Sequence, residues 1–231
     1  MIISIHQPEH LPWTVFFKKI ACCNKFILLD NVQFKKNNVQ NRNRLLDTSG
    51  DTYWATVPTN NASSKTLIID KEIATTVDWR DGYLRKIHES YSSTPFFREL
   101  FGEFEDIINL QHLTICTLNI DIILWVLRKL SINTEIILAS ELDVTGHKSS
   151  LLVNLCKAVN ATTYISGSGG KDYLDTSEFI ANKITVEFKD LKPSVYASEH
   201  KIKNLSILDF IFRHGPEVVA QEIKGKRKVL A

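Results

Sequence analysis

Residues 1–30 constrain the fold most, because they alternate between two kinds of apolar pattern. Residues 2–5 are a β-branched run that is too short for a helix and suits a buried strand. Residues 12–22 then repeat apolar side chains at helical spacing, and residues 25–30 form a second apolar run that ends in Asp30. A strand, a helix and a strand in this order predict a β-α-β unit with parallel strands.

The same alternation returns near the end of the chain and predicts the fold class. Further strands are expected at residues 134–139, 162–166 and 184–188, with helices at 149–159, 176–181, 206–213 and 217–223. Between the two α/β stretches we expect a loop at 31–44, a hairpin formed by 52–58 and 66–70, and helices at 78–91, 94–110 and 113–130. The chain is thus predicted to be α/β, with a mostly parallel sheet flanked by helices in a Rossmann-like three-layer arrangement. We expect one domain over residues 1–231, with a helical block at about 78–130 inserted in or packed on its core.

Composition and charge exclude several classes of protein. The chain has 231 residues, of which 44% are hydrophobic and 23% charged, as in a globular protein with one substantial core. Its 28 basic residues are spread among 26 acidic ones, so no nucleic acid partner is expected, and the basic cluster at 224–228 is interpreted as a solvated tail. No signal peptide and no membrane span are recognisable, and the four cysteines suit a reduced state. We therefore expect a cytoplasmic protein.

Polar chemistry begins where the first strand ends. His6, Gln7 and His10 lie on a loop stiffened by Pro8 and Pro12, and the His-x-x-x-His spacing can bring two imidazoles to one ligand. The alternative is that both histidines cap the strand and bind neighbouring backbone, and the sequence leaves the two interpretations open. No metal site is expected, because no third His or Cys stands at a zinc-ligand spacing.

Other polar groups are expected to converge on the same place. Ligands of open α/β sheets bind beyond the carboxyl ends of the strands, and here the residues that follow the strands are polar. They are His6, Gln7 and His10, then Asp30 and Gln33, then Ser140 and Glu141, and then the run at 166–171. We expect these residues to share one edge of the sheet.

Two segments have the composition of an anion-binding site. Glycines that allow close backbone approach stand with a cation and an aromatic ring in the run Gly167, Ser168, Gly169, Gly170, Lys171 and Tyr173. This run matches neither a Walker A loop nor Gly-x-Gly-x-x-Gly, and a plain strand-to-helix turn explains it equally well. The second segment, residues 37–44 with Asn41 and Arg42, offers amides and two guanidiniums that can hold a phosphate or carboxylate, although a solvated loop is the alternative. Trp13 can stack on a sugar or base, or serve the core.

Taken together, these segments resemble the WbqC-like family of bacterial proteins. The matching segments follow the family's order and cover essentially the whole chain: 5–13 (IHQPEHLPW), 28–34 (LLDNVQF), 40–44 (QNRNR), 56–58 (TVP), 165–174 (ISGSGGKDYL) and 205–209 (LSILD). The family's motif falls on His6, Gln7, Pro8, Pro12, Trp13, Asp30, Gln33, Asn41, Arg42, Gly167, Gly169, Gly170 and Tyr173. One departure is Ser168, which stands where the family pattern has a proline.

The resemblance implies a role in the biosynthesis of surface polysaccharide, notably the O-antigen of lipopolysaccharide. On this basis we expect a transferase that moves an acyl or aminoacyl group to the amine of a nucleotide-linked amino sugar, with acyl-CoA or ATP as candidate co-substrates. His6 is the expected general base, Asp30 orients His6 or the amine, and His10 assists or stabilises an oxyanion.

Two other functions and the oligomeric state stay open. A nucleotidylyltransferase that uses ATP also places histidines after a strand, although its His-x-x-His spacing differs from the one here. The third interpretation is a non-catalytic protein of the same pathway that binds a sugar nucleotide.

Overall fold

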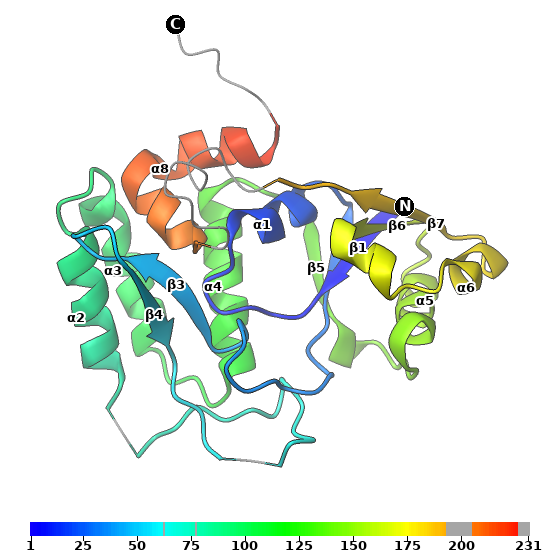
Figure 1. The fold of residues 1–231 in the computed structure, drawn as a ribbon, viewed down its shortest axis with the longest axis horizontal. Helices are drawn as coiled ribbons and strands as arrows, with labels where there is room; N and C mark the ends of the chain where they lie inside the picture. The colour runs from blue at the N-terminus through cyan, green and yellow to red at the C-terminus, as the bar shows by residue number, and fades with distance from the viewer. Residues whose placement is uncertain (62, 77, 193–204, 226–231) are drawn as a thin grey trace, which may run out of the picture.

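The computed structural model describes residues 1–61, 63–76, 78–192 and 205–225 (Figure 1). Its centre is a five-stranded parallel sheet with the strand order β5-β2-β1-β6-β7. The strands are β1 (Ile2–His6), β2 (Lys25–Leu28), β5 (Glu135–Leu138), β6 (Thr163–Gly167) and β7 (Thr185–Lys189). The predicted parallel α/β sheet is confirmed.

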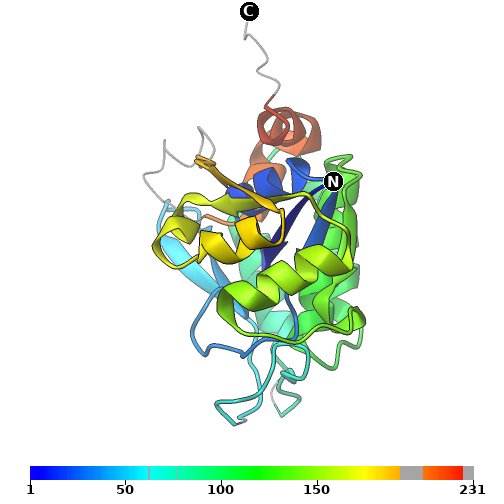
Figure 2. The ribbon, with the colours of Figure 1, turned by 90° about the vertical axis from the view of Figure 1, so that its right-hand side faces the viewer.

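Helices cover both faces of this sheet. α1 (Thr14–Ala21), α4 (Ile115–Lys129) and α8 (Ile207–Ile223) pack on one face, and α5 (Lys148–Ala158) and α6 (Thr176–Ala181) pack on the other. Figure 2 shows α5 and α6 in front of the strands. The side chains of β2 alternate accordingly, since Phe26 and Leu28 join the cluster of α1 and α4 while Ile27 joins that of α5. The expected three layers are therefore present.

The strand order locates the edge at which a ligand can bind. From β1 the chain first adds β2 and β5 on one side and then returns to add β6 and β7 on the other. The order thus reverses between β1 and β6, and such a switch point is where open α/β sheets bind ligands. Because Ser4 pairs with Ile165, the ends of these strands at His6 and Gly167 lie side by side.

Between β2 and β5 the chain forms a hairpin and three helices. β3 (Arg42–Leu46) and β4 (Thr52–Thr56) pair antiparallel, and α2 (Arg80–Tyr91), α3 (Phe97–Asn109) and α4 follow. These three helices correspond to the helical block expected at about 78–130. They share one hydrophobic cluster with α1 and α8, so the block packs directly on the sheet's helical layer.

The hairpin forms with a different partner from the expected one. β4 pairs with residues 42–46, of which 42–44 were expected to belong to a loop, whereas residues 66–69 bond to the backbone of residues 30–34. The sequence of β3, RNRLL, alternates between outward arginines and inward Asn43 and Leu45. An inward asparagine weakens the apolar alternation from which a strand is predicted.

The remaining elements add short turns and a kink. The 3₁₀ helices η1 (Ala139–Glu141) and η2 (Ser168–Asp172) follow β5 and β6. The two terminal helices expected at 206–223 form α8, which is interrupted at Gly215 (φ 78°, ψ 159°) before Pro216. In the described part of the chain all four cysteines are free, and no helix is long and apolar enough to span a membrane. The basic cluster expected at 224–228 lies largely outside the described residues.

Candidate functional site

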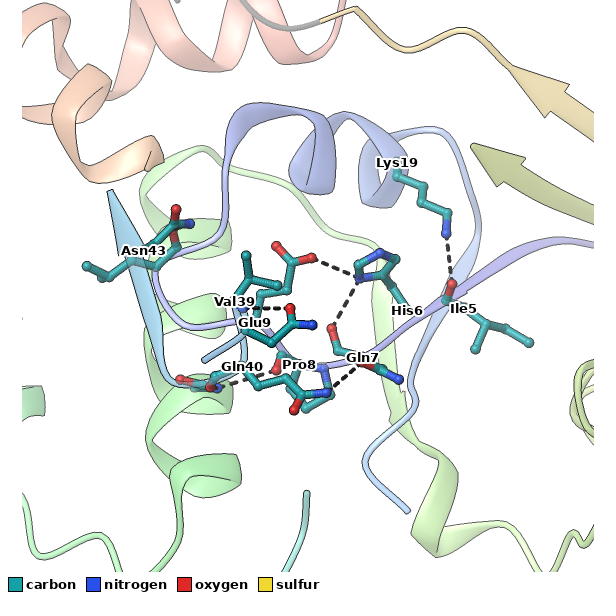
Figure 3. Close-up of polar contacts among 12 residues, drawn as sticks. Ile5, His6, Gln7, Pro8, Glu9, Lys19, Val39, Gln40 and Asn43 are labelled. Carbon is teal, nitrogen blue, oxygen red and sulfur yellow. Dashed lines mark hydrogen bonds and ion pairs between the residues drawn. The ribbon is translucent and has the colours of Figure 1, made fainter. Parts of the chain in front are cut away.

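His6 lies at the end of β1, beneath α1. Its ring meets Phe16 edge-on at 5.4 Å between centroids, and its side chain is 39% exposed. Nδ1 lies 3.2 Å from the carbonyl oxygen of Gln7, and because a carbonyl only accepts, Nδ1 carries the hydrogen (Figure 3). Nε2 makes no hydrogen bond within the described ranges and keeps its lone pair. His6 is therefore oriented with its basic nitrogen free.

Two buried titratable groups flank His6. Glu9 is 5% exposed, and its Oε1 lies 3.6 Å from Nδ1 of His6, while its Oε2 makes no hydrogen bond among the described residues. Lys19 of α1 is 8% exposed, and its ammonium donates to the carbonyl of Ile5 at 2.8 Å (Figure 3). The sequence showed Glu9 inside the histidine loop, but nothing in the pattern distinguished Lys19 from the adjacent Lys18.

Burial shifts the titration of all three groups. It raises the pKa of Glu9 to about 8 and lowers the pKa of Lys19 to about 8. Burial and the Lys19 ammonium together lower the pKa of His6 below its usual value. His6 is therefore neutral at pH 7, with two groups beside it that change protonation near neutrality, which is typical of functional sites.

His10 has different surroundings from His6. It is fully buried, with Nδ1 3.0 Å from Oδ1 of Asn119 on α4 and Nε2 2.7 Å from the hydroxyl of Tyr83 on α2. Burial lowers its pKa to about 4. Both ring nitrogens are occupied, so the geometry favours the structural interpretation for this residue and leaves no free nitrogen for the assisting role expected from the sequence.

Asp30 is also fully buried and bonded to a neighbouring strand end. Its Oδ1 accepts from the amide of Ser140 at 2.9 Å, and its Oδ2 accepts from the Ser140 hydroxyl at 2.6 Å. These bonds hold η1 against the end of β2. Within the described residues the hydrogen bonds of the Asp30 carboxylate go to Ser140 and not to His6, so Glu9 takes the place beside His6 that was expected for Asp30.

Amide side chains connect the histidine loop to the segment before β3. Gln40 donates from Nε2 to Oε1 of Gln7 at 2.7 Å (Figure 3). Asn41 is 8% exposed and donates to the carbonyl of Val57 at 2.9 Å, but its buried Oδ1 makes no hydrogen bond within the described ranges. Gln7 and Asn41, both expected to bind substrate, therefore belong to one connected part of the structure.

Three other expected binding residues make contacts elsewhere. Arg42 lies on the outer face of the hairpin, with its guanidinium 4.3 Å from the centroid of the Trp54 ring. Gln33 is exposed and donates to the carbonyl of Ser64. Trp13 is the residue before α1 and packs against the main hydrophobic cluster. None of these contacts involves His6.

The glycine loop leaves β6 beside His6, and its glycines differ in their surroundings. A Cβ placed on Gly167 or Gly169 meets no atom within 4 Å, and neither residue has a positive φ, so neither packing nor conformation requires glycine there. On Gly170 a Cβ would overlap the hydroxyl of Ser166. The open backbone at Gly167 and Gly169 leaves room for a ligand to approach closely.

Four side chains of the same loop are exposed. They are Ser168, Lys171, Asp172 and Tyr173, of which Tyr173 is 69% exposed. The Lys171 ammonium lies 5.9 Å from the centroid of the Phe188 ring on β7. A cation, a hydroxyl and an aromatic ring are thus free to contact an anionic or sugar ligand at this edge.

Two further features of the described residues concern metal binding and the hollows of the surface. No group of three or more His, Cys, Asp or Glu side chains among the described residues is arranged to hold a metal ion. A hollow of about 390 Å³ is lined in part by Asn24 and Thr134, which precede β2 and β5. It lies at the amino ends of the strands, the edge opposite His6.

Comparison with known proteins relates nearly the whole chain to one family. The WbqC-like protein family matches residues 7–221. The uncharacterized protein Rv1507c of Mycobacterium tuberculosis is 29% identical over 224 residues, which cover 93% of this chain and 94% of that relative. No solved structure gives a significant match. Since the family match spans far more than half of the sequence, the chain belongs to the WbqC-like protein family.

Proposed function

We propose that this protein is a cytoplasmic transferase that modifies a nucleotide-linked amino sugar used for bacterial surface polysaccharide, such as the O-antigen of lipopolysaccharide. The transferred group is an acyl or aminoacyl group, and the acceptor is the sugar amine. The observation that carries the proposal is the neutral, partly exposed imidazole of His6 at the switch point of the sheet, beside the open backbone of Gly167 and Gly169. A base next to an anion-accessible backbone suits chemistry on a phosphate-bearing substrate.

His6 acts in this proposal as the general base. As the amine nitrogen bonds to the carbonyl carbon of the donor, Nε2 accepts the proton that the amine loses, and the bond to the leaving group breaks with its electron pair on that group. The leaving group is a thiolate if the donor is an acyl-CoA and a phosphate if the donor is activated by ATP. Nδ1–H stays bonded to the carbonyl of Gln7, which holds the ring in place while the imidazolium forms.

The substrate's anionic part binds at the glycine loop in this proposal. The backbone of Gly167 and Gly169 is open to a diphosphate, and the exposed Lys171 supplies positive charge. Tyr173, which is 69% exposed, offers a ring face to the sugar.

The test begins with a thermal-shift screen of UDP- and dTDP-linked amino sugars. The nucleotide sugar that stabilises the protein most is then incubated with the protein and either acyl-CoA or amino acids and ATP. The products are identified by mass spectrometry. We expect an N-acylated or N-aminoacylated product from the wild type and none from His6→Asn. His147→Asn is the matched control, because His147 is exposed at the start of α5. Full activity of folded His6→Asn protein would remove His6 from the mechanism.

The same experiment separates the two other functions. A nucleotidylyltransferase releases pyrophosphate from ATP or another nucleoside triphosphate, and a binding protein is stabilised by a nucleotide sugar without forming a product from any donor. The buried ring of His10 argues against the nucleotidylyltransferase, because of the two histidines in the loop only His6 has a ring nitrogen left to contact a triphosphate.

A further inference from the structure

The outer face of the β3–β4 hairpin carries two arginines around one tryptophan. Arg44 pairs directly with Trp54 across the hairpin, and Arg42 is two residues along the same face. Their guanidinium carbons lie 4.9 Å and 4.3 Å from the centroid of the Trp54 ring. We name these three residues the hairpin platform.

The hairpin platform is exposed and carries two positive charges. Trp54 remains 44% exposed although two guanidiniums lie over it, whereas Trp79 and Trp125 are 8% and 1% exposed. Neither Arg42 nor Arg44 forms an ion pair within the described ranges. Two like charges beside one ring attract an anion, and guanidiniums bind phosphate oxygens in bidentate fashion.

A purely structural explanation accounts for only part of this arrangement. Cross-strand pairs of long and aromatic side chains stabilise hairpins, and one arginine against Trp54 would serve that purpose. A second arginine on the same face adds repulsion between like charges. An anion bound by the two guanidiniums offsets that repulsion.

The hairpin platform is connected to the histidine loop by a short segment. Arg42 donates to the carbonyl of Asn37 at 2.6 Å, which closes the loop that precedes β3. Within that loop Gln40 bonds to Gln7, the residue after His6. A ligand on the hairpin platform therefore contacts the element that also holds the histidine loop.

We propose that the hairpin platform binds the nucleoside phosphate part of the substrate. The base stacks on the exposed indole of Trp54, and the phosphate attached to the nucleoside accepts hydrogen bonds from the guanidiniums of Arg42 and Arg44, whereas the phosphate attached to the sugar is the one that lies at the glycine loop in the proposed function. This inference rests on the proposed function, in which the sugar is linked to a nucleotide, and it adds the place where the nucleotide is recognised. Stacking does not distinguish the bases strongly, so the hairpin platform recognises the class of nucleoside phosphates.

The experiment uses the full chain and measures the binding of UDP, dTDP, ADP and GDP by calorimetry, with uridine and inorganic pyrophosphate as partial ligands. Trp54→Leu removes the stacking surface, Trp54→Phe keeps a smaller ring, and Arg44→Gln removes one charge. We expect Trp54→Leu to weaken nucleotide binding by about tenfold or more, and Trp54→Phe to weaken it less. Arg44→Gln should weaken the binding of UDP and pyrophosphate while leaving that of uridine unchanged. Arg85→Gln on α2 is the matched control for charge and should bind like the wild type.

The outcomes distinguish this inference from the proposed function. If a nucleotide binds the wild type, Trp54→Leu and Arg44→Gln equally well, the nucleotide-binding role of the hairpin platform is overturned and the proposed function stands. If no nucleotide or nucleotide sugar binds the wild type, both fail. Nucleotide binding that depends on Trp54, without product from any donor, supports the hairpin platform and contradicts the transferase. Tighter binding of a single-stranded oligonucleotide than of any mononucleotide overturns the inference in favour of a nucleic acid partner.

Discussion

Nδ1 of His6 lies 3.6 Å from Oε1 of Glu9, three residues further along the same loop. Pro8 lies between them and limits the backbone to a narrow range of conformations, so the loop itself fixes this pair. Lys19 reaches the same region from α1 and donates to the last carbonyl before His6. The proposed base is therefore oriented by its own loop and its pKa is adjusted from the neighbouring helix.

Replacing Lys19 with methionine should raise the pKa of His6. The Lys19 ammonium is one of the two causes that lower this pKa, so removing the charge leaves only burial. The measurement is the titration of the His6 ring signals by NMR in the wild type and in Lys19→Met. Lys18→Met is the matched control, because Lys18 pairs with Glu222 on α8. An unchanged His6 titration in folded Lys19→Met protein would show that the ammonium does not act on the imidazole.

Stability should fall when the pH is lowered from about 6.5 to about 4. His10 has a pKa of about 4 in the folded protein and about 6.5 in the unfolded chain, so the unfolded state binds more protons in this range. The difference corresponds to roughly 3 kcal/mol, which is present above pH 6.5 and lost as the pH approaches 4. The depressed pKa of His6 acts in the same direction. Urea unfolding at several pH values in this range measures how the free energy of unfolding depends on pH. A free energy that does not change with pH would contradict the low pKa of His10.

Glu9 should oppose this acid dependence. Its pKa rises from 4.5 to about 8 on folding, so its contribution to stability is present below pH 4.5 and is lost as the pH rises to about 8. Glu9→Gln removes that term, and its stability should therefore fall more steeply on acidification than that of the wild type. The same urea titration compares the two proteins. Equal slopes would show that the Glu9 carboxyl titrates as it does in water.

The sheet could be predicted from the sequence because its strands and helices have strong apolar periodicity. The run at 2–5 and the helix after Pro12 specify a β-α-β unit locally, and the rule for parallel connections supplies the rest. The same topology led to the expectation that His6 and Gly167 end on one edge, which the pairing of β1 with β6 bears out. The local pattern of apolar residues was therefore enough to predict strands that are buried on both faces.

The surroundings of individual polar residues could not be predicted in the same way. His6 and His10 are equivalent in the sequence, yet Tyr83 and Asn119, which bind His10, come from helices far along the chain. Lys19 resembles a solvated helix residue until α1 packs over β1. β3 was missed because its partner strand and the inward hydrogen bond of Asn43 to Leu11 determine its conformation. Tertiary contacts therefore decided each of these outcomes.

Tyr91→Phe should destabilise the fold, because it removes a hydrogen bond to Asp209, the last residue of the family segment at 205–209. The Tyr91 hydroxyl donates to Oδ1 of Asp209 at 2.8 Å and accepts from the amide of Leu46 at 2.9 Å, and both side chains are fully buried. Removing the hydroxyl leaves the Leu46 amide and a buried carboxylate short of a partner, at a cost of about 1–3 kcal/mol. Urea unfolding measures the loss. Tyr53→Phe is the control, because among the described residues that hydroxyl has one hydrogen bond, which it accepts from Ser90 at 3.3 Å. An equal loss in both variants would contradict the role of Asp209.

Alanine at Gly170 and at Gly169 should affect different properties of the protein. At Gly170 the new Cβ overlaps the buried Ser166 hydroxyl and lies 3.1 Å from Leu174 Cδ1, so we expect a loss of about 1–3 kcal/mol in unfolding free energy. At Gly169 the Cβ meets no atom within 4 Å, so stability should stay within about 0.5 kcal/mol of the wild type.

Nucleotide-sugar binding should be weakened more by Gly169→Ala than by Gly170→Ala, which is the opposite of their order of effect on stability. A methyl group at Gly169 occupies the space that the proposed diphosphate needs, so Gly169→Ala should weaken binding without unfolding the protein. Ser166→Ala combined with Gly170→Ala removes the overlapping hydroxyl and should recover part of the lost stability. Thermal unfolding and calorimetry on the three variants measure both properties. Unchanged binding by Gly169→Ala would place the anion elsewhere on the sheet edge, because a close backbone approach at Gly169 leaves no room for a side chain.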